Sequence, residues 1–207
     1  GEPGAAGELA ALHAPAAHLD DGRPARTLAD RAALELGREM GLLTAKPVLY
    51  LANTDEPGEP AAELAAHAAA QGAAALALPV GLELELARMD PEEAAELAAE
   101  LELGDVRGAD AVVAAGYRLL DLVTFFTGSG PPEARAWPVP RGTVASRAAG
   151  RIHSDMERGF IRAEVIPWDD LVRCGSFARA REEALVRVEG RDYVVQEGDV
   201  IQVRFNV

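Results

Sequence analysis

Residues 148–165 read AAGRIHSDMERGFIRAEV, and the chain closes on RFNV at residues 204–207. This stretch mixes glycines, aromatic rings and charges, whereas the rest of the chain is rich in Ala, Glu and Leu. Around it, short apolar and β-branched runs alternate with turn signals such as Glu189-Gly190-Arg191-Asp192 and Glu197-Gly198-Asp199. The pattern predicts a C-terminal domain built on short strands.

The C-terminal part is predicted to be a small mixed sheet that packs against helices. Strands are expected at residues 122–127, 136–139, 160–166, 184–188, 193–196 and 200–205, and helices near 145–149 and 177–183. A mixed sheet that grasps a helix within about 80 residues is the β-grasp arrangement, which is of the α+β class. We therefore expect a β-grasp domain over residues 122–207.

The middle of the chain has the pattern of an α/β sheet. Residues 47–52 form a continuous apolar run that ends at Asn53, as expected for a buried parallel strand. After it we expect a helix over 61–71, a second buried strand over 73–80, a helix from Pro91, and a helix over 106–120. This succession predicts the end of a doubly wound α/β sheet in residues 41–121.

Residues 5–41 are predicted to be helical. Leu28, Ala32 and Leu36 fall on one face of a helix, and Thr27 precedes them as a candidate N-cap. A helical pattern that begins at the first residues, without an initiator Met, suggests that further sequence precedes it.

The charge of the chain is unevenly distributed. Of 207 residues, 49% are hydrophobic and 26% charged, and the formal net charge is −14. Residues 1–129 hold eight basic and 22 acidic groups, whereas residues 130–207 hold 12 of each. The acidic part repels polyanions, so no DNA partner is expected, whereas the balanced part can present Arg to RNA. The alternative is that the acidic residues are solvated faces of helices.

The sequence indicates neither a membrane segment nor export. No apolar run approaches the ~20 residues of a membrane span, and residues 1–4 lack signal-peptide character. A single cysteine, Cys174, excludes an intrachain disulfide, and no His neighbours it to make it a nucleophile. We expect a cytoplasmic protein without a membrane partner.

Residues 148–207 and three earlier stretches resemble one known family. The earlier stretches are Gly116-Tyr117-Arg118-Leu119-Leu120, Phe125-Phe126-Thr127-Gly128 and Arg135-Ala136-Trp137. Together they resemble the C-terminal portion of the YchF/Obg-like ATPases, which are P-loop nucleotide-binding proteins. The resemblance implies a helical arm remnant over 1–40, the C-terminal part of a G domain over 41–121, and a ubiquitin-like TGS domain over 122–207. It also implies a ribosome-associated protein that uses ATP or GTP with magnesium.

Asn53-Thr54-Asp55-Glu56 is the candidate loop for binding a purine base, because it directly follows the strand predicted at 47–52. P-loop GTPases carry Asn-Lys-x-Asp there, and the Asp accepts two hydrogen bonds from guanine. Glu56 is one methylene longer and Thr54 replaces the Lys, so this loop should tolerate adenine. The resemblance therefore assigns base binding to Asn53, Thr54 and Glu56.

The next nucleotide loop of the family is Ser-Ala-Lys-like, and it falls here on Pro79-Val80-Gly81. This departure leaves only backbone amides to approach a base, and we assign no side chain there.

The motifs that hold phosphate and magnesium are missing from this sequence. A P-loop needs G-x-x-x-x-G-K-[ST], yet the only lysine, Lys46, has no such glycine frame. No Asp-x-x-Gly loop sits in a fitting place ahead of Asn53. We therefore assign no catalytic residue, and the status of this chain as an enzyme stays open.

Two other chemistries have weaker support. His153, Asp155 and Glu157 alternate and would share one face of a strand, but no second His or Cys lies nearby to complete a metal site. The acidic pairs Glu83/Glu85 and Glu92/Glu93 have the pattern of solvated helix faces. We assign no metal site.

Five arginines are candidates for contact with RNA, because Arg can bind phosphate and neighbouring aromatic rings can stack on bases. They are Arg141, Arg147, Arg151, Arg158 and Arg162, interleaved with Trp137 and Phe160. The alternative is that these arginines pair with Glu157, Glu164 and neighbouring acids on a sheet surface.

Three hypotheses therefore stay open. The chain is the C-terminal portion of a YchF-type nucleotide-binding protein, a non-enzymatic module that binds RNA or the ribosome on an α/β scaffold, or a truncated product with a structural role. The first makes a purine nucleotide and the ribosome or its RNA the expected partners.

Overall fold

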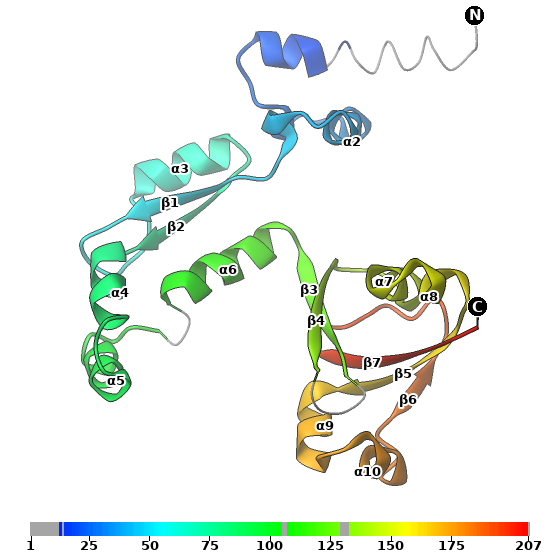
Figure 1. The fold of residues 1–207 in the computed structure, drawn as a ribbon. Helices are drawn as coiled ribbons and strands as arrows, with labels where there is room; N and C mark the ends of the chain where they lie inside the picture. The colour runs from blue at the N-terminus through cyan, green and yellow to red at the C-terminus, as the bar shows by residue number, and fades with distance from the viewer. Residues whose placement is uncertain (1–12, 14, 105–106, 129–132, 207) are drawn as a thin grey trace, which may run out of the picture. The chain divides into compact units, whose positions relative to one another are not determined.

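The computed structural model describes residues 13, 15–104, 107–128 and 133–206, and its architecture is mixed α/β (Figure 1). The chain divides into two compact units, residues 1–119 and 120–207. Each unit has its own sheet, two-stranded in the first and five-stranded in the second. The predicted helical residues before 13 and most of the loop expected at 128–132 lie outside the described residues.

The first unit begins with helical segments. Residues 15–20 are helical, and they are followed by η1 (Ala25–Thr27), α2 (Arg31–Glu39) and η2 (Leu43–Ala45). The expected start of a helix near Thr27 and Leu28 is wrong. Asp30 caps α2 instead, because its carboxylate accepts hydrogen bonds from the backbone amides of Ala32 and Ala33.

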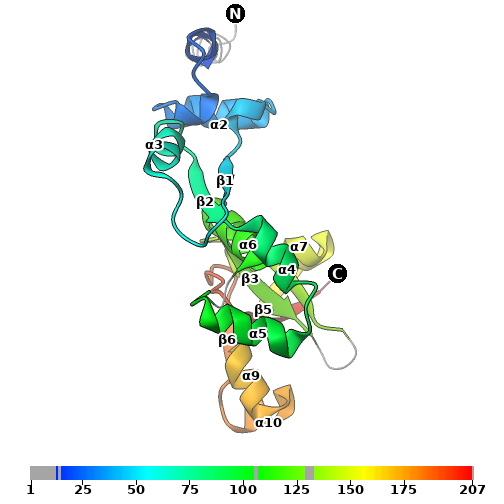
Figure 2. The same cartoon turned by 90° about the vertical axis from the view of Figure 1, so that its left-hand side faces the viewer.

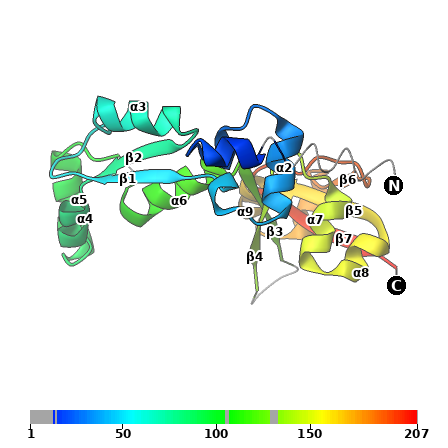
Figure 3. The same cartoon turned by 90° about the horizontal axis from the view of Figure 1, so that it is seen from above.

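The two strands predicted in the middle of the chain are confirmed as a parallel pair. They are β1 (Leu49–Asn53) and β2 (Ala74–Leu78), joined through α3 (Ala62–Ala70). The helix expected near 106–120 is α6 (Gly108–Leu119), and residue 106 lies outside the described residues. Helices α3 and α6 lie on opposite sides of the β1–β2 pair (Figure 3).

The prediction that these strands are buried on both faces is wrong for β1. Leu51, at its centre, is 47% exposed. The described part of this unit pairs no third strand with β1 or β2. A parallel strand is normally buried between neighbouring strands and covering helices, and among the described residues β1 has β2 as its single neighbouring strand.

Two further helices follow β2 and contact each other (Figure 2). They are α4 (Val80–Leu86) and α5 (Pro91–Glu100). The prediction for α5 is confirmed: Pro91 opens the helix, Glu92 and Glu93 occupy the first turn, and Asp90 accepts the amide hydrogen of Glu92.

The second unit is a five-stranded mixed sheet with the order β4-β3-β7-β5-β6. The strands are β3 (Leu122–Thr127), β4 (Arg135–Pro140), β5 (Phe160–Pro167), β6 (Arg187–Glu189) and β7 (Asp199–Phe205). Its helices are α7 (Ala145–Ile152), α8 (Ser154–Arg158), α9 (Trp168–Cys174) and α10 (Phe177–Glu182). Strand β7 is central: it pairs antiparallel with β5 and parallel with β3.

The sheet has an apolar core on each face. Helices α7 and α8 cover one face, where Val165 of β5 lies in a cluster with Phe125 and Ala148. Helices α9 and α10 cover part of the other face, where Ile166 packs with Val200 and Cys174 (Figure 1). Successive residues of β5 thus point into different cores, as the two-residue period of a strand requires.

Three predictions for this unit are wrong. Residues 193–196 form only one bridge, between Val144 and Val194, because Asp199 draws the Gln196 amide and the Tyr193 hydroxyl into a turn. Residues 184–186 are not strand, since Ala184 has a φ of +56° and reverses the chain after α10. The alternating residues from His153 to Glu157 belong to α8 and not to a strand.

Candidate functional site

Asn53 is fixed at the carboxyl end of β1 by a bond to the next loop. Its side-chain Oδ1 accepts a hydrogen bond from the Val80 amide at 3.3 Å. The Thr54 amide donates to the Leu78 carbonyl oxygen at 3.1 Å, which continues the contact between the two strand ends. The Thr54 hydroxyl donates to the Glu56 carbonyl oxygen at 2.8 Å and closes a turn.

The turn leaves its acidic side chains on the surface. Asn53, Asp55 and Glu56 are exposed, while Thr54 is half-buried beneath them. In open α/β sheets, ligands bind outside the carboxyl ends of parallel strands, which is where this turn lies. The arrangement presents carboxylates that can accept hydrogen bonds from a ligand with N–H groups.

Residues 79–81, where the family resemblance places a second nucleotide loop, are not an open loop in the structure. Pro79 is buried, and Val80 begins α4. The Val80 amide is engaged by Asn53, so it positions the Asn53 side chain and does not face a ligand directly.

A cleft of about 520 Å³ lies between α4 and the start of α6. The carboxylate of Glu83 pairs with Arg107 across it at 3.5 Å. Gly108 has a φ of +56°, and a Cβ there would lie 2.9 Å from the Glu83 carboxylate. The acidic pair Glu83/Glu85 therefore includes one structural ion-pair partner, which the sequence did not reveal.

Three of the five candidate arginines are engaged by nearby carboxylates. Arg141 pairs with Asp121 at 2.9 Å, Arg147 pairs with Glu157 at 2.7 Å, and Arg158 pairs with Asp155. Arg151 and Arg162 are exposed and form no ion pair with any residue that the structure describes.

The five arginines do not form one surface. Arg147 and Arg151 lie on α7 and Arg158 lies on α8, over one face of the sheet. Arg162 lies on β5 and shares the other face with Glu164 and Ile166, because its neighbours Ala163 and Val165 point into the core under α7.

The two aromatic residues interleaved with these arginines make contacts within the fold. Trp137 donates its Nε1 hydrogen to the Thr127 hydroxyl at 2.8 Å and stacks on Phe125, with ring centroids 6.5 Å apart. Phe160 is buried, and Arg191 covers its ring. Contact of these five arginines with RNA stays a prediction, and it rests on their charge.

Glu164 pairs with two arginines that the sequence did not connect to it. Its carboxylate accepts hydrogen bonds from Arg181 of α10 at 2.6 Å and from Arg204 of β7 at 3.3 Å. The side chain of Glu164 is only 13% exposed. The hydrogen bond from Arg181 holds the pKa of this carboxyl below its usual range, against the opposing effect of burial, and Arg204 adds to the lowering.

We expect this network to weaken in acid. A carboxyl with a lowered folded-state pKa stabilises the fold fully above its unfolded pKa of about 4.3, and the stabilisation is lost as pH falls through the folded pKa. Wild type should lose about 1 kcal/mol more unfolding free energy than Glu164→Gln between pH 7 and pH 3. Denaturant titrations at both pH values measure this, with Glu182→Gln on exposed Glu182 as the control. Equal losses in wild type and Glu164→Gln would contradict the assignment.

The residues considered for a metal site have structural roles in α8. His153 accepts the Asp155 amide hydrogen through Nδ1 and caps α8, and Glu157 binds Arg147. No group of three metal-ligating side chains occurs in the part of the chain that the structure describes.

Burial raises the pKa of the Cys174 thiol, which donates to Glu183 at 3.4 Å. No described helix combines the length and the apolar character that crossing a membrane requires.

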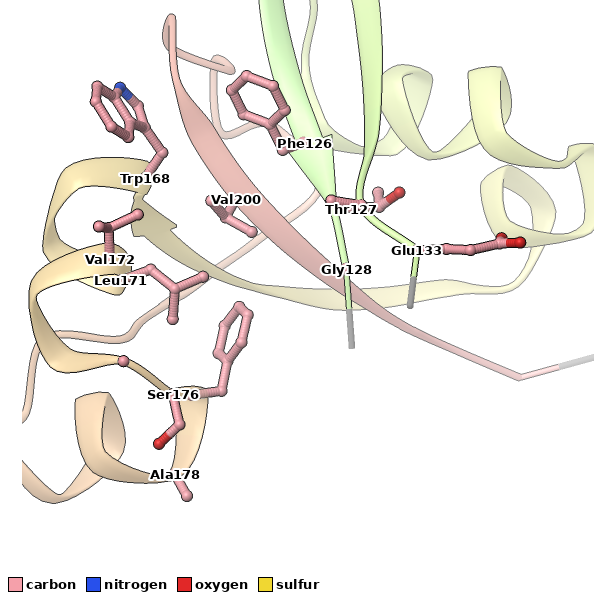
Figure 4. A pocket seen from close by; sticks show the side chains of 13 residues that line it. Phe126, Thr127, Gly128, Glu133, Trp168, Leu171, Val172, Ser176, Ala178 and Val200 are labelled. Atoms are coloured by element: carbon pink, nitrogen blue, oxygen red, sulfur yellow. The ribbon is translucent and has the colours of Figure 1, made fainter. Parts of the chain in front are cut away.

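An apolar groove of about 720 Å³ in the second unit was not predicted (Figure 4). Trp168, Leu171 and Val172 of α9 face Phe126 of β3 and Val200 of β7 across it. Its hydroxyl groups are engaged: Thr127 accepts from Trp137, and Ser176 caps α10 by accepting from the Arg179 amide. The groove suits an apolar group. The only sequence signal was the apolar spacing at 168, 171 and 172 after Pro167.

Comparisons with known proteins agree on one family. The family model YchF-GTPase_C, described as a protein of unknown function (DUF933), matches residues 122–206. The chain is 43% identical over 180 residues to the "Ribosome-binding ATPase YchF" of Bacillus subtilis (strain 168), a match that covers 84% of this chain and 49% of that protein. It is 39% identical over 199 residues to "Obg-like ATPase 1" of Oryza sativa subsp. japonica, which covers 92% of this chain and 50% of that protein.

A solved structure agrees with the sequence comparisons. The Schizosaccharomyces pombe YchF GTPase superposes with a TM-score of 0.71 at 27% identity, covering 89% of this chain and 50% of that chain. The chain thus spans about half the length of the relatives it matches.

Proposed function

The chain belongs to the YchF/Obg-like ATPase family and matches the C-terminal half of its members, and we propose that it is the C-terminal portion of such a nucleotide-binding protein. The observation that carries the proposal is 43% identity over 84% of the chain to a ribosome-binding ATPase. In this proposal, residues 1–40 are a remnant of a helical arm, 41–121 the C-terminal part of a P-loop G domain, and 122–207 a β-grasp TGS domain.

The turn at Asn53, Thr54 and Glu56 binds the purine base of ATP or GTP in this proposal. The bond from the Val80 amide supports a fixed orientation for Asn53, which leaves its Nδ2 hydrogens for a base. Glu56 lies in an exposed turn held by Thr54, and its carboxylate can accept a hydrogen bond from the exocyclic amine of adenine. A preformed turn of this kind reduces the entropy lost on binding.

Hydrolysis belongs to the complete protein in this proposal. This chain carries neither the glycine-framed lysine for phosphates nor an identified magnesium ligand, so its residues contribute base recognition only. When bound, magnesium would neutralise charge on the β- and γ-phosphates. The complete protein would act in the cytoplasm.

The second candidate function is a non-enzymatic contact with the ribosome or its RNA. It is favoured by the neutral charge balance of residues 130–207, where all 12 basic residues are arginines, and by the relative's printed name. Exposed Arg151 and Arg162 support it more than Arg141, Arg147 and Arg158, whose charges are balanced by carboxylates. Both functions can reside in one protein.

Replacing Glu56 with Asp in the complete protein tests the base site. The shorter carboxylate should approach the two guanine donors and shift the ratio of ATP to GTP affinity toward GTP by about tenfold, the effect of one charged hydrogen bond. Calorimetric titration with each nucleotide and magnesium measures the ratio. Glu59→Asp makes the same chemical change at an exposed residue outside the turn and should leave the ratio unchanged. An unchanged ratio in Glu56→Asp would refute the base-binding role of this turn.

A further inference from the structure

The first turn of α4 holds the amide that fixes Asn53 at the end of β1. Val80 begins α4, and its amide donates to Oδ1 of Asn53. Helix α4 has seven residues, and its N-cap residue, Pro79, supplies no side-chain hydrogen bond. Such a short helix without a side-chain cap is marginal by itself, so contacts elsewhere in the fold have to hold its start in place.

Glu83 anchors this first turn to another helix. Val80 is 39% exposed and Gly81 is exposed, so neither holds the turn by burial. The side chain of Glu83 is only 13% exposed, and its carboxylate pairs at 3.5 Å with Arg107, which directly precedes α6. Gly108 leaves room for this carboxylate at the start of α6, since a Cβ there would lie 2.9 Å from it. The positive end of the α6 dipole adds to the attraction.

These contacts close a ring. Helix α6 packs on both β1 and β2, and Asn53 is the last residue of β1 (Figure 3). The Val80 amide joins Asn53 to α4. One turn later, Glu83 joins α4 back to α6 through Arg107, and within that turn the Glu83 amide donates to the Pro79 carbonyl oxygen at 3.0 Å. The ring therefore holds the Val80 amide within reach of Asn53.

The bond from Val80 decides which group Asn53 presents to a ligand. The terminal torsion of an Asn side chain is broad and roughly two-fold, so an unbound side chain presents either Oδ1 or Nδ2. With Oδ1 engaged by the Val80 amide, Nδ2 is left to donate to a ligand. Adenine carries a hydrogen-bond acceptor at N7, which attracts an amide donor and repels a carbonyl oxygen. The orientation of Asn53 therefore affects the affinity for a purine.

We propose that the ion pair of Glu83 and Arg107 orients Asn53 for base recognition. It acts by holding the start of α4 against the end of β1, so Glu83 and Arg107 are positioning residues that do not contact the nucleotide. The inference rests on the proposed base-binding function of the turn at residues 53–56 and deepens it. Weakening the pair should lower affinity only for purines with an acceptor at N7, because contacts with the ribose and the phosphates do not involve Asn53.

Comparison of ATP with 7-deazaadenosine triphosphate isolates the contact of Asn53, because the analogue carries a C–H group in place of N7. Calorimetric titration of the complete protein with each nucleotide and magnesium measures both dissociation constants. Wild type should bind ATP about fivefold more tightly than the analogue, the effect of one hydrogen bond. In Glu83→Gln and in Arg107→Gln, affinity for ATP should fall about threefold or more, while affinity for the analogue should change by less than about twofold.

Two variants on the same helices serve as matched controls. Glu85→Gln makes the same chemical change at an exposed residue of α4, and Arg118→Gln makes it at an exposed residue of α6. Both should keep the preference of wild type for ATP. Arg107→Lys should keep most of it, because the pair has a single contact at 3.5 Å that an ammonium group can replace.

The outcomes separate the positioning role from the base site itself. Equal binding of ATP and the analogue by wild type would overturn the base contact of Asn53 and the positioning role together. An undiminished preference for ATP in Glu83→Gln and Arg107→Gln would overturn the positioning role and leave the base site standing. Equal weakening of both nucleotides in these variants would also overturn it, because a folding defect has that effect, and thermal unfolding of each variant checks the fold.

Discussion

Replacing Gly159 with alanine is expected to reduce the unfolding free energy of the 120–207 unit by about 3 kcal/mol, at the upper end for an overpacked site. A Cβ at Gly159 would overlap the carbonyl oxygen of Asn206. The obstacle is backbone and cannot rotate away, and the Asn206 amide is itself bonded to the Gly159 carbonyl oxygen at 2.9 Å. The φ of Gly159 is −89°, which alanine adopts freely, so the cost is steric and not conformational.

Denaturant unfolding followed by tryptophan fluorescence measures this cost, because Trp137 and Trp168 both lie in the second unit. Gly190→Ala is the matched control: no atom lies within 4 Å of a Cβ built there, so its effect should stay within about 0.5 kcal/mol. If Gly159→Ala and Gly190→Ala lowered the unfolding free energy by similar amounts, the Asn206 backbone would have to move easily to admit a methyl group at Gly159.

Replacing Asp199 with alanine is expected to have the second large effect. We expect the unfolding free energy of the 120–207 unit to fall by about 3 kcal/mol. The side chain of Asp199 is 4% exposed and accepts hydrogen bonds from the Tyr193 hydroxyl at 2.8 Å and from the Gln196 amide at 2.9 Å. Both donors are left without this acceptor in the variant. The ion pair with Arg187, at 3.6 Å, adds less because Arg187 is half-exposed.

Two variants separate the parts of this network. Tyr193→Phe removes the hydroxyl alone and should cost about 1 kcal/mol, because Asp199 keeps the Gln196 amide. Asp192→Ala removes an exposed carboxylate from the preceding turn and should cost less than about 0.5 kcal/mol. Tryptophan fluorescence during denaturant unfolding again measures each variant. If Asp192→Ala cost as much as Asp199→Ala, general charge and not the buried network would stabilise the turn.

Local sequence predicted the elements whose signal is local. The apolar run at 47–52 and the alanine-rich helix at 61–71 correspond to β1 and α3, because period and composition identify such segments without knowledge of their neighbours. Helix α9 was missed because it has only seven residues and follows β5 without a break. Residues 193–196 were assigned to a strand because their composition does not reveal that Asp199 binds both the Gln196 amide and the Tyr193 hydroxyl and bends the segment.

The candidate sites, too, depend on contacts between residues that are distant in sequence, which local patterns do not predict. The position of Asn53 at the end of a strand followed from the sequence, but its bond to Val80 depends on where the next strand ends. The sequence offered Glu164 only as one of several acids that could pair with the five candidate arginines. It binds Arg181 and Arg204 instead, and both are brought to it by the fold from distant parts of the chain.

The central place of β7 in the second sheet has a consequence for synthesis of the chain. The β3–β4 hairpin and the antiparallel β5–β6 pair can form as their residues emerge, but these two pairs are joined only through β7, which follows all four strands. Until β7 is made, two strand edges with apolar faces stay unpaired. A sheet closed by such distant contacts folds more slowly than one closed by neighbours, so nascent chains of this protein should stay vulnerable to protease until residues 199–205 have been added.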